Sequence, residues 1–332
     1  MTTTQTTPRA RYTNPVYPGY FADPFVLRAA DGLYYAYGTG PLPEGDLKHF
    51  PVLRSADLAH WEMLGGALEP LQDPPAFSYW APEVAERDGG QGGYYMYYSA
   101  STSHSDEHHR IRIAIADRPE GPFRDSGKIL IPQIGFSIDA SPFRDPADGT
   151  WYLFFATDYE TEAPFGTGLA VVRLGGDMLS TTSEPRLVVR ASADWQIYER
   201  NRNYKGKTWA AWNCVEGPSV VEHGGKYYCF YSGGAWHTTN YGVGFAVADH
   251  PLGPWRDDFA AHGPAVLKGI EGSVLGPGHN STMMGPDGRT LYMAYHAWDP
   301  AHTARRMFID PIRWTPNGPR VDGPSVTERA VE

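Results

Sequence analysis

The sequence lacks any cluster of basic residues. Aspartate and glutamate outnumber lysine and arginine by 38 to 28, which gives a formal net charge of −10 at pH 7. Nucleic-acid binding depends on lysine and arginine side chains that release counterions from phosphates. The charge balance therefore excludes nucleic acid as the expected partner.

The chain also lacks a hydrophobic run long enough to cross a bilayer. Its first 15 residues are polar and contain no hydrophobic segment of the kind found in secretion signals. We therefore expect no membrane insertion and a cytoplasmic location.

Cysteine is scarce, with only Cys214 and Cys229 in the chain. A Gly-Gly turn at residues 224–225 would pair Val220 with Cys229 across a hairpin, and Cys214 lies six residues before Val220. A disulfide requires Cα atoms within about 7 Å of each other. We therefore predict two free thiols, which fit a reducing compartment.

No long amphipathic helix is visible, but one β-hairpin pattern occurs about five times. Most copies begin with an acidic residue close to a proline, continue through a short apolar run and a glycine-containing turn, and end in an aromatic strand. Aromatic residues favour strands, and such turns favour hairpins. The copies cover residues 22–39, 80–101, 138–158, 215–234 and 276–299.

The repeat predicts an all-β fold, a five-bladed β-propeller whose blades are four-stranded antiparallel sheets around a central axis. The segments IAIADRPEGPFRD (113–125) and FAVADHPLGPWRD (245–257), which follow two of the hairpins, are alike and strengthen the prediction. We expect one propeller domain over residues 14–325, with polar tails at 1–13 and 326–332. A pair of β-sandwiches would explain the strands but not the repeat.

The hairpin entrances carry the residues of chemical interest. They are Asp23, Glu83, Asp139, Glu216 and His279, spaced 56 to 77 residues apart. If each begins the innermost strand of a blade, all five converge at one end of the axis. Crowded carboxylates repel and raise one another's pKa, so hydrophobic residues would pack an axis at lower cost. The acids therefore suggest a functional site.

At these positions the sequence resembles glycoside hydrolase family 43, which acts on arabinose- and xylose-containing polysaccharides. The resemblance spans residues 14–325 and includes the motifs ADPF (22–25), WAPE (80–83), IDASP (138–142), EGPS (216–219) and GHN (278–280).

The resemblance implies an inverting mechanism with three carboxyl groups. Asp23 would be the general base that activates water, and Glu216 the general acid that protonates the leaving oxygen. Asp139, ionised, would raise the pKa of Glu216 and orient it. Inversion also requires the acid and the base to stand about 6.5–9.5 Å apart, so that water fits between base and sugar.

Three tryptophans are candidate sugar platforms, because flat apolar rings match apolar sugar faces. They are Trp80, Trp212 and Trp236, and each could equally pack within the sheets. Glu83 could lie near the site or only fix the start of its strand.

An arginine near the last blade is implied as a sugar contact, and both Arg305 and Arg306 are candidates. The family needs no cofactor for its chemistry, but the resemblance implies a cation, commonly calcium, near His279. Imidazole is a poor calcium ligand, so waters would complete the coordination shell.

Three further histidines, His104, His108 and His109, lie in a polar loop without the spacing of a metal site. We expect them in a solvated loop.

The leading hypothesis is an exo-acting α-L-arabinofuranosidase, with β-D-xylosidase activity as a variant, acting on arabinose- or xylose-containing oligosaccharides. The absence of a visible secretion signal favours an exo-enzyme that finishes imported oligosaccharides. An endo-α-1,5-L-arabinanase of the same fold is the enzymatic alternative. A non-catalytic sugar-binding propeller is the alternative from another class, and it is disfavoured because all three acids are present.

Overall fold

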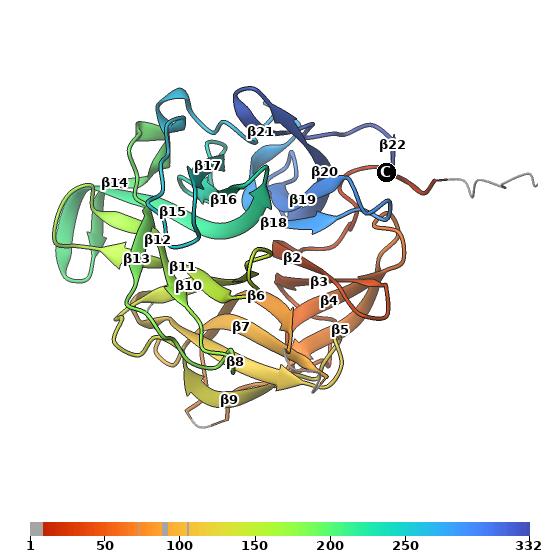
Figure 1. Cartoon of the computed structure of the whole chain (residues 1–332), viewed down its shortest axis with the longest axis horizontal. Helices are drawn as coiled ribbons and strands as arrows, with labels where there is room; N and C mark the ends of the chain where they lie inside the picture. The colour runs from red at the N-terminus through yellow and green to blue at the C-terminus, as the bar shows by residue number, and fades with distance from the viewer. Residues whose placement is uncertain (1–8, 73, 88–91, 105) are drawn as a thin grey trace, which may run out of the picture.

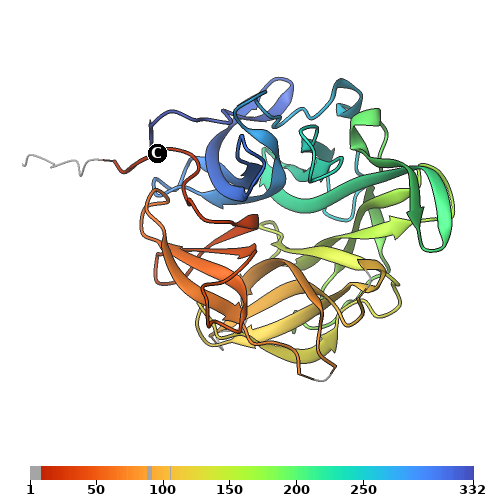
Figure 2. The ribbon, with the colours of Figure 1, turned by 180° about the vertical axis from the view of Figure 1, so that it is seen from behind.

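A computed structural model describes residues 9–72, 74–87, 92–104 and 106–332. Its strands form curled sheets that follow one another in chain order around a common centre (Figure 1; from behind, Figure 2). In the described residues the only helices are three short 3₁₀ turns: η1 (Asp106–His108), η2 (Asp194–Gln196) and η3 (Ala260–His262). The all-β prediction is confirmed, and the arrangement is consistent with a propeller.

Three of the sheets have four antiparallel strands each in sequence order. The first comprises β2 (Ala22–Arg28), β3 (Tyr34–Thr39), β4 (His49–Ser55) and β5 (Glu62–Leu68). The second comprises β6 (Ser78–Glu86), β7 (Tyr94–Ser101), β8 (Arg110–Ala116) and β9 (Arg124–Ile129). The last comprises β18 (Leu275–Met284), β19 (Leu291–Trp298), β20 (Arg305–Thr315) and β21 (Gly318–Val321).

Between them lies an eight-stranded sheet. Its first part comprises β10 (Ser137–Arg144), β11 (Trp151–Tyr159), β12 (Gly166–Arg173) and β13 (Arg186–Val189). Its second part comprises β14 (Ile197–Tyr204), β15 (Lys207–His223), β16 (Lys226–Gly233) and β17 (Gly242–Ala248). Two parallel pairs join the parts, Gly166 with Asn213 and Thr167 with Cys214.

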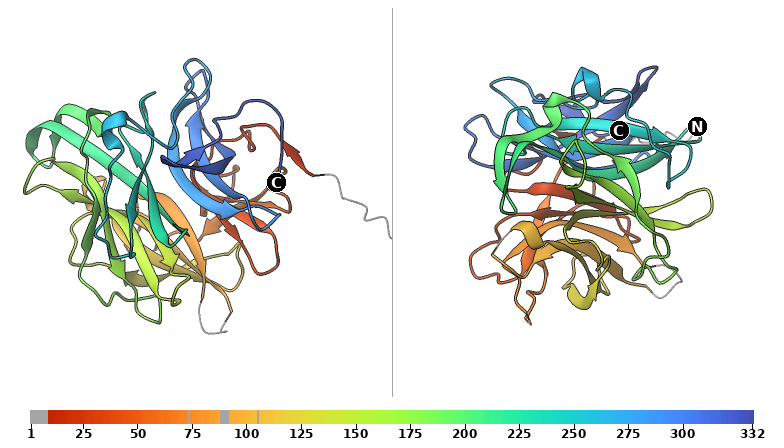
Figure 3. Two further views of the ribbon diagram at one scale, coloured as in Figure 1. Left: turned by 45° about the horizontal axis from the view of Figure 1, so that its top comes forward. Right: turned by 90° about the vertical axis from the view of Figure 1, so that its left-hand side faces the viewer.

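The two ends of the described chain meet. Strand β1 (Arg11–Tyr12) pairs antiparallel with β22 (Arg329–Ala330), and Figure 3 shows the C-terminus beside the red N-terminal segment. These strands lie outside the predicted domain limits at residues 14 and 325, so ordered structure extends further at both ends.

The aromatic strands are buried on both faces by neighbouring sheets, which explains their nearly continuous apolar sequence. In β7, Met96 and Tyr98 pack with the first sheet, whereas Tyr95 and Tyr97 pack with Phe155 and other residues of the next sheet. Each fully buried side chain of this size contributes about 1.5–3 kcal/mol to stability. The core is thus made of layers between sheets.

Every innermost strand is interrupted by a β-bulge. In β2, β6, β10, β15 and β18 the pairing register with the next strand shifts, and at each shift one residue has positive φ. These residues are Asp23 (51°), Ala81 (45°), Asp139 (55°), Gly217 (57°) and His279 (48°). We call these five positions the corners. A bulge of this kind re-aims a side chain out of the regular alternation of a strand.

Two of the residues predicted to begin the innermost strands, Glu83 and Glu216, do not occupy corners. Glu83 is two residues beyond the corner of its strand, which is Ala81, and Glu216 is one residue before its corner, which is Gly217. The acid-proline pattern looks alike in all copies, but the bulge determines which residue occupies the equivalent place.

The two cysteines are free and buried. Val220 pairs with Cys229 across the hairpin, as predicted. Among the described residues, no helix is long and apolar enough to cross a membrane.

Candidate active site

A pocket of about 330 Å³ lies where the innermost strands converge. Most of the residues predicted for a site line it: Asp23, Trp80, Asp139, Glu216, Trp236, His279 and Arg305. Three others, Glu83, Trp212 and Arg306, do not. Thr39, Asp106, Ile138 and Tyr198 complete the lining and were not predicted.

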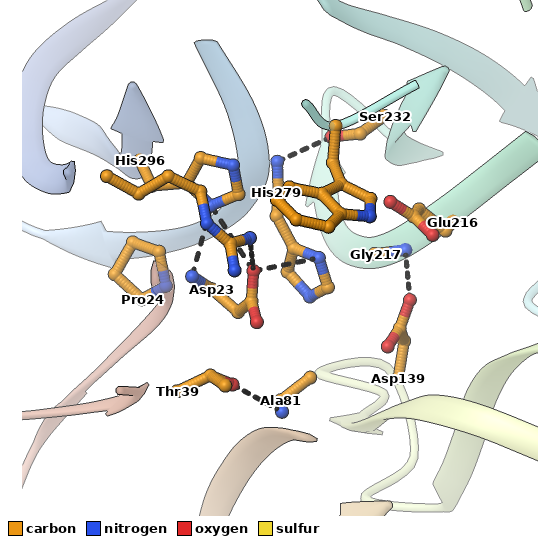
Figure 4. Close-up of polar contacts among 12 residues, drawn as sticks. Asp23, Pro24, Thr39, Ala81, Asp139, Glu216, Gly217, Ser232, His279 and His296 are labelled. Carbon is orange, nitrogen blue, oxygen red and sulfur yellow. Dashed lines mark hydrogen bonds and ion pairs between the residues drawn. The ribbon is translucent and has the colours of Figure 1, made fainter. Parts of the chain in front are cut away.

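The carboxylate of Asp23 lies beside two basic side chains, those of Arg305 and His279. Its Oδ1 lies 3.2 Å from Nη1 of Arg305 and 3.5 Å from Nδ1 of His279 (Figure 4). Burial alone would raise the pKa of Asp23, but His279 and Arg305 outweigh it and hold this pKa far below the usual range. Asp23 is therefore ionised throughout the physiological pH range.

A second histidine, His296, fixes the backbone of this corner. The backbone N–H of Asp23 donates to Nδ1 of His296 at 3.1 Å, so this nitrogen accepts and the ring is neutral. Burial lowers the pKa of His296 to about 4, in agreement with a neutral ring.

Asp139 is held against the strand that carries Glu216. The backbone N–H of Gly217 donates to its Oδ2 at 3.0 Å, and its own N–H donates to Oγ of Ser99 at 3.1 Å. Burial raises the pKa of Asp139 to about 7, with Glu216 and Asp23 acting in the same direction and His279 against it. Asp139 thus titrates near neutral pH, which differs from the expectation of an ionised partner, because it is buried among other acids.

Glu216 is held by two neutral donors. Oη of Tyr241 donates to Oε1 at 2.6 Å, and Sγ of Cys214 donates to Oε2 at 3.1 Å. Burial, followed by Glu216, raises the pKa of the Cys214 thiol well above its usual value, so the thiol keeps its proton. Both carboxylate oxygens therefore have fixed partners.

His279 occupies a corner between the acids. Its backbone N–H donates to Oγ of Ser232 at 2.7 Å. Burial acts to lower its pKa, but Asp23, Asp139 and Glu216 outweigh this and raise it. A protonated ring between these carboxylates balances part of their charge and has no lone pair free for a metal.

The surroundings of His279 do not fit a directly bound calcium ion. Calcium takes six to eight oxygen ligands. His279 lines the main pocket and also a small space beside Asn280 and Glu83, and the small space has only about 10 Å³, room for roughly one water. The described residues contain no group of three or more His, Cys, Asp or Glu that could hold a metal.

The structure distinguishes the two candidate arginines. Arg305 points into the pocket, where its Nε donates to Oη of Tyr20 at 3.0 Å and its guanidinium carbon lies 4.4 Å from the ring centroid of Trp236. Arg306 instead pairs with Asp299 at 3.1 Å and does not line the pocket. Neighbouring residues of a strand face opposite sides, so only one of the two can reach the site.

Trp80 is supported from behind by a buried histidine. The ring of His109 stacks on Trp80 with centroids 3.5 Å apart, and its Nε2 lies 2.9 Å from Oγ of Ser78. The expectation of a solvated loop is therefore wrong for His109, which is fully buried. Burial lowers its pKa to about 3, so the supporting ring is neutral.

Two predicted site residues have other surroundings. Glu83 lines the small space beside His279, where burial raises its pKa well above the usual value. Trp212 is 1% exposed and packs edge-on against Tyr204 and Trp209, at centroid distances of 4.8 and 5.1 Å.

Sequence reasoning missed the residues that position the acids: Cys214, Tyr241, His296, Ser232 and Ser99. Cys214 could have been found from the sequence, because residues two positions apart in a strand lie on the same face, and Cys214 precedes Glu216 by two positions. The others reach the site from distant segments, and nothing in their local sequence marks them.

Comparison with known proteins gives a consistent result. The sequence model of a family described as glycosyl hydrolases family 43 matches residues 12–319. The chain is 31% identical to a thermostable family-43 glycoside hydrolase of known structure, with a TM-score of 0.81 over 96% of this chain and 98% of that one.

Two characterised relatives are also similar in sequence. A β-D-galactofuranosidase of Aspergillus niger is 27% identical, covering 90% of this chain and 80% of its own. An extracellular exo-α-(1→5)-L-arabinofuranosidase of Streptomyces chartreusis is 29% identical, covering 87% of this chain and 83% of its own.

Proposed function

Because the chain belongs to glycoside hydrolase family 43, as its motifs predict, we propose that it is an inverting exo-enzyme that releases a terminal pentose. The sugar is α-L-arabinofuranose, with β-D-xylose as the second substrate, and the source is an oligosaccharide of the plant cell wall. The observation that carries this proposal is one pocket that contains two carboxyl groups, Asp23 and Glu216, in contrasting surroundings.

Asp23 is the general base. Its contacts with Arg305 and His279 keep it ionised, which is the form that a general base needs in order to accept a proton from water. The same contacts fix its direction toward the pocket.

Glu216 is the general acid that protonates the leaving oxygen. Tyr241 and Cys214 hold its two oxygens without adding charge. Asp139 is the third carboxyl group. It contacts the backbone of Gly217, the residue after Glu216, and its negative charge builds up as pH rises through about 7.

The compact pocket supports exo action. Its lining includes Tyr198, Asp106, Trp236 and Arg305, and its volume is about 330 Å³. A relative named as an exo-α-(1→5)-L-arabinofuranosidase supports arabinose as the first choice of sugar.

We propose further that the fold is a single domain of five blades. The eight-stranded sheet counts as two blades, since β10 and β15 each have their own corner and the two parts share only two residue pairs of strand pairing. Residues 245–257, which resemble 113–125, supply the outer part of the second half, where Val247 pairs with Arg256.

The substrate is tested with a panel of aryl α-L-arabinofuranoside, aryl β-D-xyloside, linear arabinan and xylooligosaccharides. We expect turnover of aryl arabinofuranoside and release of single sugars. Following the first product anomer by NMR should show inversion. A retained anomer would contradict the mechanism, and rapid loss of arabinan viscosity would contradict exo action.

The two roles are tested by Asp23→Asn and Glu216→Gln. We expect Asp23→Asn to lose at least about 100-fold in kcat on every substrate. Glu216→Gln should lose far more on oligosaccharides than on aryl glycosides, because an aryl leaving group needs little protonation. Equal losses on both substrate types would exclude Glu216 as the acid, and near-normal turnover by Asp23→Asn would exclude it as the base.

A further inference from the structure

A second pocket of about 110 Å³ opens off the first. The two share part of their lining, including Trp80, Tyr198, Trp236 and Glu216. They therefore lie side by side, and Glu216 lines both. Asp23 and Arg305 line the first pocket but not the second.

The wall of the second pocket is a hairpin formed by β14 and the first half of β15. This hairpin projects at the left edge of Figure 1 and is seen again in Figure 3. Its tip is fastened to the neighbouring strand: Oη of Tyr204 and Nζ of Lys205 donate to Asp158 at 3.2 and 2.9 Å. Thr167 donates to the other oxygen of Asp158 at 3.0 Å. Both oxygens of this carboxylate therefore accept hydrogen bonds from residues around the second pocket.

Arg202 is the polar group that this wall offers to the pocket. Its guanidinium carbon lies 4.6, 4.3 and 5.4 Å from the ring centroids of Tyr198, Tyr204 and Trp212. In the described chain the one carboxylate within 4 Å is that of Glu199, at 3.8 Å, which is beyond hydrogen-bonding distance. The rings thus fix the plane of the guanidinium while its N–H groups keep donor capacity for a ligand.

From this arrangement we propose that the second pocket binds the leaving sugar and that Arg202 selects it by donating to its hydroxyl groups. The inference rests on the proposed inverting mechanism. In that mechanism water attacks from the side of the base and the leaving group departs toward the acid. The pocket that contains Glu216 but not Asp23 is therefore on the departure side.

The chemistry of the lining indicates a neutral sugar of one ring. At about 110 Å³ the second pocket has a third of the volume of the first, which is about 330 Å³, so we assign it a single ring. The carboxylate of Asp106 lines the same space, and Glu199 lies beside Arg202. This negative charge disfavours an acidic sugar, whereas aromatic faces beside hydrogen-bond donors suit a polyhydroxylated ring.

The test compares two substrates that share the same released pentose. One is the oligosaccharide, whose leaving group is a sugar, and the other is the aryl glycoside, whose leaving group has no hydroxyls. Arg202→Ala should lower kcat/KM on the oligosaccharide on the order of 10- to 100-fold, the range for a hydrogen bond to a charged group, with less than about threefold change on the aryl glycoside. Arg202→Lys keeps the charge but not the planar fork, and should lose an intermediate amount.

Arg200→Ala is the matched control. Arg200 is on the same strand, its side chain is 61% exposed, and its partner is the exposed Asp194. It should leave both substrates unchanged. Equal losses on both substrates by Arg202→Lys, with an unchanged melting temperature, would overturn the proposal, and so would no loss on either. A larger loss on an oligosaccharide with an acidic leaving sugar would overturn the assignment to neutral sugars. Turnover of the aryl glycoside by the unmodified protein tests the proposed function separately.

Discussion

The thiol of Cys214 donates a hydrogen bond to the carboxylate of Glu216, with Sγ and Oε2 3.1 Å apart. The two residues are two positions apart in β15, so their side chains leave the strand on the same face. The partner of the acid is thus built into the strand that carries it, and does not depend on how the sheets dock.

We predict that Cys214→Ala lowers kcat/KM on an oligosaccharide about fivefold. Loss of the thiol removes one of the two donors that hold the carboxyl group of Glu216, and a neutral hydrogen bond contributes about 1 kcal/mol. Cys214→Ser keeps a donor and is the control. The measurement is kcat/KM on an oligosaccharide, whose leaving sugar needs the proton of Glu216, and equal values for Ala, Ser and the unmodified protein would contradict the prediction.

The second prediction concerns Arg305. Arg305→Gln removes a positive charge 3.2 Å from Asp23, so the pKa of Asp23 should rise and the acid limb of kcat/KM should move to higher pH. We also expect kcat/KM to fall by about 10- to 100-fold, since a charged hydrogen bond is lost. Arg306→Gln removes the same charge outside the pocket and should change neither quantity. Similar losses of kcat/KM in the two variants would contradict the conclusion that Arg305, and not Arg306, acts in the pocket.

The third prediction concerns the pH dependence of stability. The folded-state pKa of Asp139 is raised to about 7, from about 3.9 in the unfolded chain. The folded protein therefore binds this proton more tightly, and its contribution is present below pH 4 and is lost as pH rises to about 7. In Asp139→Asn the free energy of unfolding should fall less steeply over this range, by up to about 1.4 kcal/mol per pH unit.

This difference is measured by urea unfolding of both proteins between about pH 4 and 8. Asp194→Asn, at an exposed site, is the control and should keep the slope of the unmodified protein. Parallel curves for Asp139→Asn and the unmodified protein would contradict the raised pKa.

The fourth prediction concerns the corner at Ala81. Its φ of 45° is unfavourable for any residue with a Cβ, by roughly 1–2 kcal/mol. Ala81→Gly should therefore destabilise the protein less than Ala156→Gly, a buried site in the regular strand β11, by about that amount. Thermal and urea unfolding of the two variants give the comparison. A larger cost at Ala81 would show that its corner is not strained.

The sequence was sufficient to predict the all-β repeat and the convergence of Asp23, Asp139 and Glu216. These follow from motifs that recur at similar spacing, and each lies within a few residues of its corner. The sequence could not show that Ala81, rather than Glu83, takes the equivalent place. A bulge adds one residue to a strand, and its position depends on backbone pairing rather than on the acid-proline pattern.

The contacts that support the site residues could not be predicted from the sequence, for a different reason. His109 sits in a loop that looks solvated, yet it is buried behind Trp80 because that loop folds back under the ring. His296 meets Asp23 across 273 residues of chain. Only the arrangement of the sheets around a common centre brings such pairs together, and no local sequence pattern predicts them.

The corners have a consequence for how this scaffold could acquire new activities. Each is the same backbone shape, and the chain uses three of them for Asp23, Asp139 and His279 while Ala81 and Gly217 offer no functional group of their own. The ring is therefore geometrically repetitive but chemically asymmetric. Replacing one side chain at a corner would change which acids, bases and cations surround the centre, while the backbone stays the same. The corners are therefore suitable positions for directed evolution.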